Sequence, residues 1–97
     1  MKPYSEVKLD KNQYIRSFSS KVKTEELEWH LDREDRVIDV LENDGGWMIQ
    51  LDNKLPSLLK ETIFIPKETY HRVIKGTEGL VVRITKLYES DSTKHTG

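Results

Sequence analysis

The sequence predicts a mostly β protein that forms a single small domain. Alanine, the strongest helix former, is absent from the 97 residues, whereas Val, Ile and Thr, which favour strands, together number 21. Short apolar runs recur at roughly even spacing and are separated by turn-forming residues, which is typical of a small β-barrel or sandwich. A length near 100 residues is that of one domain.

Composition and charge exclude several classes of protein. Leu, Ile, Val and Phe supply 26 residues, which is enough for a small core. The absence of cysteine excludes disulfides, thiolate catalysis and cysteine-ligated metals. The 16 basic and 17 acidic residues are balanced, which excludes a broad field for nucleic acid. Neither a secretory signal nor an apolar run of about 18 residues is visible, so we expect a soluble cytoplasmic domain that binds no membrane.

The first 23 residues are expected to form an arm with one or two short strands, because their apolar residues follow no clean periodicity. The pattern becomes regular from Glu25, which predicts a strand over 25–32, because apolar and polar residues alternate over 27–32. A helix that starts at Thr24 is the competing interpretation, since two acidic residues follow this threonine. The strand is preferred because the apolar residues do not continue at helical spacing.

The middle of the chain carries the strongest turn signal. Residues 36–41 are rich in β-branched side chains and are predicted to form a strand. The Asn-Asp-Gly-Gly run at 43–46 then predicts a hairpin, with residues 47–51 as the partner strand.

The second half of the chain is predicted to contain a loop and three further strands. Residues 52–57 read as a loop, 62–65 as a short strand that ends at a proline, and 70–75 as another strand. Residues 76–79 begin and end with glycine and predict a second hairpin turn before a last strand over 80–88.

Two histidines and a carboxylate suggest a metal site. His30 and Asp32 are two residues apart, so a strand would present both on one face. His71 lies on a later strand, after a turn that begins at Pro66. This ligand set suits Fe(II) with open coordination positions, although Mn, Ni, Co or Zn would also be accepted. The alternative is that Asp32 is a turn residue beside Arg33 and that His71 is a hydrogen-bonded core residue.

The order of these motifs resembles that of the cupin superfamily. Residues 66–71 read Pro-x-Glu-x-x-His, similar to the second cupin motif, and residues 30–32 stand where the first motif has His-x-His. The glycine turn at 43–46 takes the place of the turn that ends the first motif. The resemblance covers residues 24–88 and implies a small double-stranded β-helix, or jelly-roll, barrel. Residues 89–97 are then expected to be a flexible tail.

The sequence departs from the usual metal-binding cupin at two positions. Asp32 stands where the family has a second histidine, and Arg36 stands where it has a glutamate. Arginine stays protonated and cannot be a metal ligand, and its charge would repel a cation. Two interpretations follow. Either His30, Asp32 and His71 hold a metal while Arg36 binds an anionic ligand, or the metal site is lost and Arg36 pairs with Asp32 in a metal-free pocket.

A second resemblance is to the iron and 2-oxoglutarate-dependent oxygenases. Their His-x-Asp, distal His and Arg-x-Ser pattern is matched by residues 30–32, His71 and residues 83–85. This resemblance implies that Arg83 binds the far carboxylate of a 2-oxoglutarate cosubstrate. The alternative is that Arg83 faces outward, because its apolar neighbours form the natural core face of the strand.

Two further predictions concern the orientation of Gln50 and the oligomeric state of the protein. Gln50 alternates with Ile49 and Leu51 and either points into the pocket with His30 or faces solvent. If His30 and Asp32 face inward, the opposite face, with Leu27, Trp29 and Leu31, needs cover, which predicts a homodimer.

The sequence thus predicts a barrel that binds a divalent metal and a small anionic molecule. Fe(II) is the favoured metal, and Arg36, Gln50 and Arg83 are the candidate ligand-binding residues. The protein is then either a metal-dependent oxygenase or a non-catalytic binding module.

Overall fold

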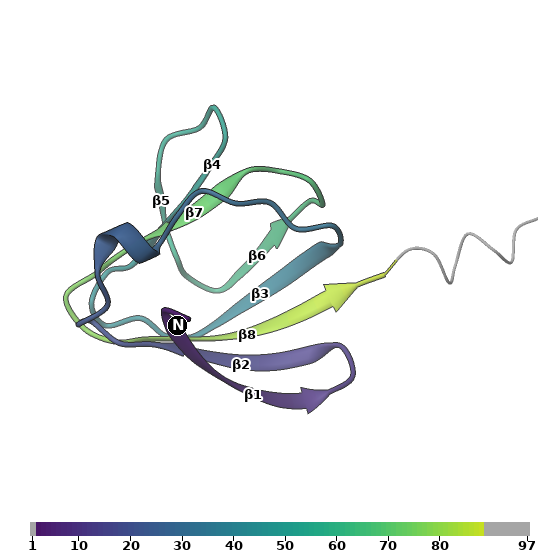
Figure 1. Cartoon of the computed structure of the whole chain (residues 1–97), viewed down its shortest axis with the longest axis horizontal. Helices are drawn as coiled ribbons and strands as arrows, with labels where there is room; N and C mark the ends of the chain where they lie inside the picture. The colour runs from purple at the N-terminus through teal and green to yellow at the C-terminus, as the bar shows by residue number, and fades with distance from the viewer. Residues whose placement is uncertain (1, 89–97) are drawn as a thin grey trace, which may run out of the picture.

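The computed structural model describes residues 2–88 and contains two antiparallel sheets (Figure 1). The larger sheet has five strands in the order β1 (Tyr4–Asp10), β2 (Gln13–Phe18), β8 (Leu80–Leu87), β3 (Asp35–Glu42) and β6 (Thr62–Ile65). The smaller sheet has three strands in the order β5 (Ser57–Leu58), β4 (Met48–Leu51) and β7 (His71–Ile74). The predicted all-β class is confirmed. Within the described residues, no helix has the length and apolarity needed to cross a membrane.

The core lies between the two sheets and follows the period of two expected of strands. In β8, Leu80, Val82 and Ile84 are buried, while the residues between them are more exposed. These side chains pack with residues from both sheets, and the buried set is Phe18, Ile38, Trp47, Ile49, Leu59, Ile65, Leu80, Val82 and Ile84.

The two glycine-rich turns connect the sheets, and the prediction that they form hairpins is wrong. The turn at 43–46 leads from β3 in the larger sheet to β4 in the smaller one, and the turn at 76–79 leads from β7 back to β8. The two turns pack against each other, since Thr77 N–H donates to the Gly45 carbonyl at 3.0 Å. Each sheet has one face to bury, and the chain buries both by crossing from one sheet to the other.

The segment before β3 also differs from its prediction. Residues 24–26 form a single 3₁₀ turn, η1 (Thr24–Glu26), so the competing interpretation of a helix start at Thr24 was partly correct. The predicted strand over 25–32 is wrong, because the chain there pairs only through an isolated bridge between His30 and His71. The two backbone hydrogen bonds of this bridge measure 3.0 and 2.9 Å. One bridge is sufficient to place the two histidines side by side.

The N-terminal arm forms part of the larger sheet. The β1 and β2 strands form an antiparallel pair at its edge, and β2 also pairs with β8. The predicted tail at 89–97 lies outside the described residues.

Candidate metal and ligand site

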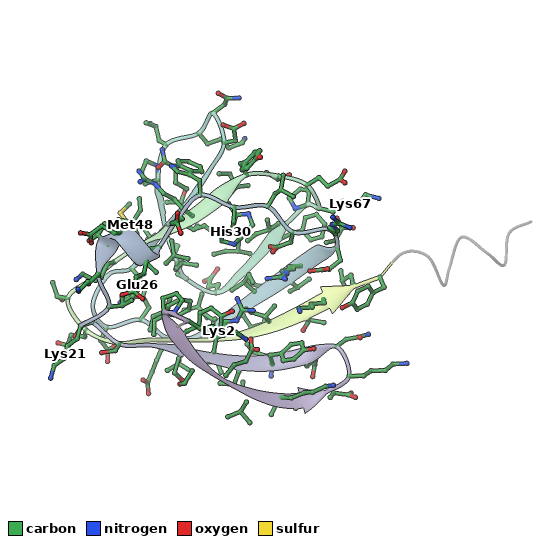
Figure 2. All side chains as sticks on the ribbon, viewed as in Figure 1. Lys2, Lys21, Glu26, His30, Met48 and Lys67 are labelled. Atoms are coloured by element: carbon green, nitrogen blue, oxygen red, sulfur yellow. The ribbon has the colours of Figure 1, made fainter. Side chains whose placement is uncertain are left out.

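The structure brings together the three predicted metal ligands. Each of His30, Asp32 and His71 offers one ligand atom, and these atoms all lie within 4.8 Å of one another. His71 is buried at the start of β7, whereas His30 and Asp32 lie on the segment between η1 and β3, which bridges to His71. In Figure 2, His30 extends from this segment toward the interior between the sheets. The two imidazole rings lie 4.3 Å apart between centroids.

Backbone carbonyls orient both imidazole rings. Nδ1 of His30 lies 3.0 Å from the carbonyl oxygen of Glu28, and Nδ1 of His71 lies 2.8 Å from that of Thr69. Because a carbonyl oxygen can only accept, Nδ1 of each ring carries the hydrogen and donates it. In the neutral imidazole this leaves the lone pair on Nε2, which is the arrangement that metal-ligating histidines usually have.

The two oxygens of Asp32 have different surroundings. Oδ1 lies 3.2 Å from Nη2 of Arg36. Oδ2 lies 3.4 Å from Nε2 of His71, yet it is buried and has no hydrogen-bond partner among the described residues. When His71 is neutral, two acceptors face each other across this gap. This contact between two acceptors is unfavourable unless a cation or a proton lies between them.

Asp32 is ionised at neutral pH. Burial raises the pKa of this carboxyl group, but the protonated form of His71, which donates from Nε2, and the positive charge of Arg36 outweigh burial. The net effect is a pKa below the usual range. Asp32 is therefore available as an anionic ligand.

Arg36, predicted to bind the ligand, does line the cavity, but acidic groups already compensate its charge. Its Nε donates to Glu34 at 2.8 Å, while its Nη2 pairs with Asp32. Only 11% of the Arg36 side chain is exposed. The pair that the metal-free interpretation predicted is therefore present.

A cavity of about 390 Å³ lies next to these residues, within the range typical of small-molecule sites. Most of its wall is apolar and belongs to the core, with contributions from Phe18, Ile38, Ile49, Leu59, Ile65, Val73, Leu80, Val82 and Ile84.

Arg16 also lines the cavity, although it was not among the residues predicted from the sequence. Its guanidinium lies 4.1 Å from the ring centroid of Tyr4 and pairs with the Glu6 carboxylate. The sequence feature that could have identified Arg16 is its position two residues before Phe18, because this spacing places both side chains on the inner face of β2.

Two predicted ligand-binding residues lie outside the cavity. Gln50 accepts hydrogen bonds from Nε and Nη2 of Arg72 at 3.0 and 2.9 Å, and it does not line the cavity. Arg83 is 42% exposed and pairs with Asp39 at 3.1 Å. Both residues alternate with buried neighbours, Ile49 and Ile84, so their side chains emerge on the outer faces of the sheets.

The comparisons with known proteins concern the fold. No family model matches the sequence, and a search of curated proteins found no match. An RmlC-like cupin family protein with a double-stranded β-helix fold from Methanocaldococcus jannaschii superposes with a TM-score of 0.65 at 12% identity, over 97% of this chain and 86% of that one.

Two solved enzymes are also similar in structure. HppE, crystallised with Co(II) and Tris buffer, gives a TM-score of 0.70 at 15% identity, over 90% of this chain and 55% of that one. DMSP lyase DddQ from Ruegeria pomeroyi gives 0.67 at 11% identity, over 81% of this chain and 39% of that one. The chain therefore spans less than two thirds of either protein. Its two antiparallel sheets and these superpositions together show that it has the double-stranded β-helix fold of the cupins.

Proposed function

We propose that this chain binds one divalent metal ion through His30, Asp32 and His71. Fe(II) is the first candidate, and Mn, Ni and Zn are alternatives with the same nitrogen and oxygen donors. The observation that carries the proposal is the buried Oδ2 of Asp32, which has no hydrogen-bond partner among the described residues and faces Nε2 of His71 at 3.4 Å. A cation at this position would satisfy both acceptors at once.

The arrangement around the three side chains supports the same conclusion. Both Nδ1 atoms are occupied by backbone carbonyls, which leaves both Nε2 atoms for a metal. Among the structures with this fold, those of HppE are described as Co(II) and Fe(II) forms, which supports a divalent metal in a cupin-type site.

The ligand that we propose beside the metal is a small anion. A bound metal would offer open positions and act as a Lewis acid. Arg36 lies next to Asp32 on the cavity wall, and its guanidinium would hold and orient the anionic group. If the protein is an enzyme, an oxygenase that uses such open positions is the class we favour. A 2-oxoglutarate cosubstrate is not part of the proposal, because Arg83 pairs with Asp39 outside the cavity.

A metal-free binding pocket is the second candidate function. The 3.2 Å pair between Arg36 and Asp32 favours it, since this pair already supplies a positive charge to the carboxylate. In that case the three side chains and Arg36 would satisfy one another, and the cavity alone would bind the ligand.

Metal titration separates the two candidates. The chain is first stripped of metal with a chelator and then titrated by calorimetry. We expect it to bind one equivalent of Mn(II) and, under anaerobic conditions, one equivalent of Fe(II). His30→Gln and Asp32→Asn should each weaken binding by at least about a hundredfold, because even the loss of a residue that only supports a ligand costs about 10–100-fold. Asp52→Asn is the matched control, because Asp52 is exposed and lies outside the cluster. Equal metal affinity for all four proteins, or no binding by the unmodified chain, would leave the metal-free pocket as the function.

A further inference from the structure

The chemistry of the cavity wall restricts what the cavity can bind. Among the described residues that line it, none is Ser, Thr, Asn or Gln, and Tyr4 carries the only hydroxyl group. Its walls are otherwise aliphatic or aromatic, apart from the charged side chains and histidines. Pockets that recognise sugars or nucleosides need several donors and acceptors to pair with hydroxyl groups, whereas most of this wall is apolar.

Among the charged side chains on the wall, Glu26 and Glu28 are exposed, and the two arginines have acidic partners. Arg16 is bound to Glu6 and stacks on Tyr4, and Arg36 is bound to Asp32 and Glu34. Each arginine therefore already has an acidic partner. A buried hydroxyl that finds no partner is costly, so each ligand hydroxyl that faces the apolar part of the wall would weaken binding.

The position of the polar groups on the wall determines how a bound ligand would be oriented in the cavity. The candidate metal ligands lie together with Arg36 at one part of the wall. Apolar side chains form most of the remainder, which also includes Tyr4, Arg16, Glu26 and Glu28. Arg36 is planar and has five N–H groups, so it can contact an anion while Asp32 and Glu34 remain bound. An anionic head at this position would leave the remainder of the ligand against isoleucine, leucine, valine and phenylalanine side chains.

We propose that the cavity takes a small monocarboxylate with an apolar body and discriminates against polyhydroxylated molecules of the same length. The position of the carboxylate rests on the proposed function, because it uses the metal site and Arg36. The preference for an apolar body rests on the cavity wall alone.

Hexanoate and gluconate provide a matched pair of probes, since both are six-carbon monocarboxylates and only gluconate carries hydroxyl groups on its chain. Hexanamide, which keeps the chain and loses the charge, tests the head group. The titrations are followed by the methyl NMR signals of isoleucine, in the metal-free chain and in the chain loaded with Zn(II), which is diamagnetic. Ile38, Ile49, Ile65 and Ile84 line the cavity, whereas Ile15, Ile63 and Ile74 do not and act as internal controls.

We expect hexanoate to shift the four cavity methyl signals, to leave the three control signals in place, and to bind at least about tenfold more tightly than gluconate or hexanamide. Gluconate binding as tight as hexanoate would overturn the apolar body, and hexanamide binding as tight would overturn the carboxylate. Shifts confined to the control residues, or no shift at about 20 mM hexanoate in either form, would overturn the whole inference.

The two proposals fail in different ways in this experiment. If Zn(II) does not bind but hexanoate shifts the cavity signals of the metal-free chain, the metal site is wrong and the apolar cavity stands. If Zn(II) binds through His30 and His71 and hexanoate produces no shift, the metal site stands and the ligand class is wrong.

Discussion

The carboxylate of Asp32 contacts two groups that make opposite demands on a metal site. Arg36 binds Oδ1 and brings a positive charge close to the position that a cation would take. His71 faces Oδ2 with a nitrogen that needs a cation or a proton between the two atoms. The affinity for a metal therefore depends on the balance between the attraction of the cation to Asp32 and its repulsion by Arg36.

Replacement of Arg36 measures this repulsion directly. We expect Arg36→Gln to raise the affinity for Mn(II) by roughly tenfold, because a positive charge next to the ion is removed. Arg33→Gln is the matched control, since Arg33 is exposed and lies outside the cavity, and its affinity should stay within about twofold. Calorimetric titration of the three chelator-treated proteins gives the comparison. An unchanged or lower affinity in Arg36→Gln would mean that Arg36 supports the site by holding Asp32 in place.

At this scale the sequence predicted which three candidate metal ligands lie together better than it predicted which polar residues line the cavity. His30, Asp32 and His71 lie close together as expected, although the segment at 25–32 is not the strand from which their spacing was argued. The pairing of Arg36 with Asp32 was also expected, four residues apart. The outward direction of Gln50 could not be decided, because its side chain is polar on a strand whose inner face was unknown.

The outer face of the larger sheet carries a polar cluster across three strands. Asp39 on β3 accepts a hydrogen bond from Thr62 of β6 at 2.7 Å and pairs with Arg83 of β8 at 3.1 Å. These residues lie opposite one another in the strand register. The hydrogen bonds from Thr62 and Arg83 hold the pKa of Asp39 below its usual range, against a smaller opposing effect of burial.

This cluster predicts a pH-dependent contribution to stability. An Asp in an unfolded chain titrates near pH 3.9, and a lower pKa in the folded state adds stability that is present above that pH. The contribution is lost as pH falls through the folded-state pKa. Asp39→Asn should lower the free energy of unfolding at pH 7 by about 0.2–1 kcal/mol, as expected for a partly exposed pair.

Urea denaturation at pH 7 and near pH 3 tests this prediction. The loss of stability between the two pH values should be smaller in Asp39→Asn than in the unmodified chain, because the variant lacks the titrating group. Asp10→Asn on β1 is the control, since no ion pair joins Asp10 to another described residue. An equal pH dependence in Asp39→Asn and the unmodified chain would contradict the role of Asp39.

The turns at 43–46 and 76–79, which connect the two sheets, leave little room for a side chain at Gly76. A Cβ atom on Gly76 would lie 2.4 Å from the Gly45 carbonyl oxygen and 2.6 Å from Cδ1 of Trp47. Because one of these neighbours is backbone and the other is the fully buried Trp47, Gly76→Ala should cost about 1–3 kcal/mol of stability. At Gly79 the nearest atom would be 3.2 Å away, so Gly79→Ala should cost less. Equal losses for the two variants in urea denaturation would show that the turns can move apart.

The strands themselves were largely predictable, whereas their pairing was not. The predicted strands at 36–41, 62–65, 70–75 and 80–88 correspond to β3, β6, β7 and β8. The glycine turns were read as hairpins because an Asn-Asp-Gly-Gly run gives a local signal for a change of direction. Whether the next strand joins the same sheet or the facing one depends on which faces must be buried together, and that information is spread over the whole chain.

At the scale of the molecule, part of the predicted outward apolar face remains exposed. Trp29 is 42% exposed and Leu31 is 37% exposed, whereas Leu27 turns inward, packs against the core and lines the cavity. The prediction that all three residues face outward is therefore wrong for Leu27, because the segment at 25–32 is not a regular strand. Trp29 has partial cover from Arg72, whose guanidinium lies 4.9 Å from its ring centroid.

We still expect a homodimer that buries Trp29 and Leu31, because a domain of this size buries little apolar surface by itself. Size-exclusion chromatography with light scattering should give about twice the chain mass of 11.4 kDa. A Trp29→Ser/Leu31→Ser double variant should shift the mass to that of a monomer while the metal titration stays unchanged, because neither residue lies in the metal cluster. Val7→Ser, at another exposed apolar residue, should remain a dimer. A monomer mass for the unmodified chain would contradict the expectation, and a dimer in the double variant would place the interface on another face of the barrel.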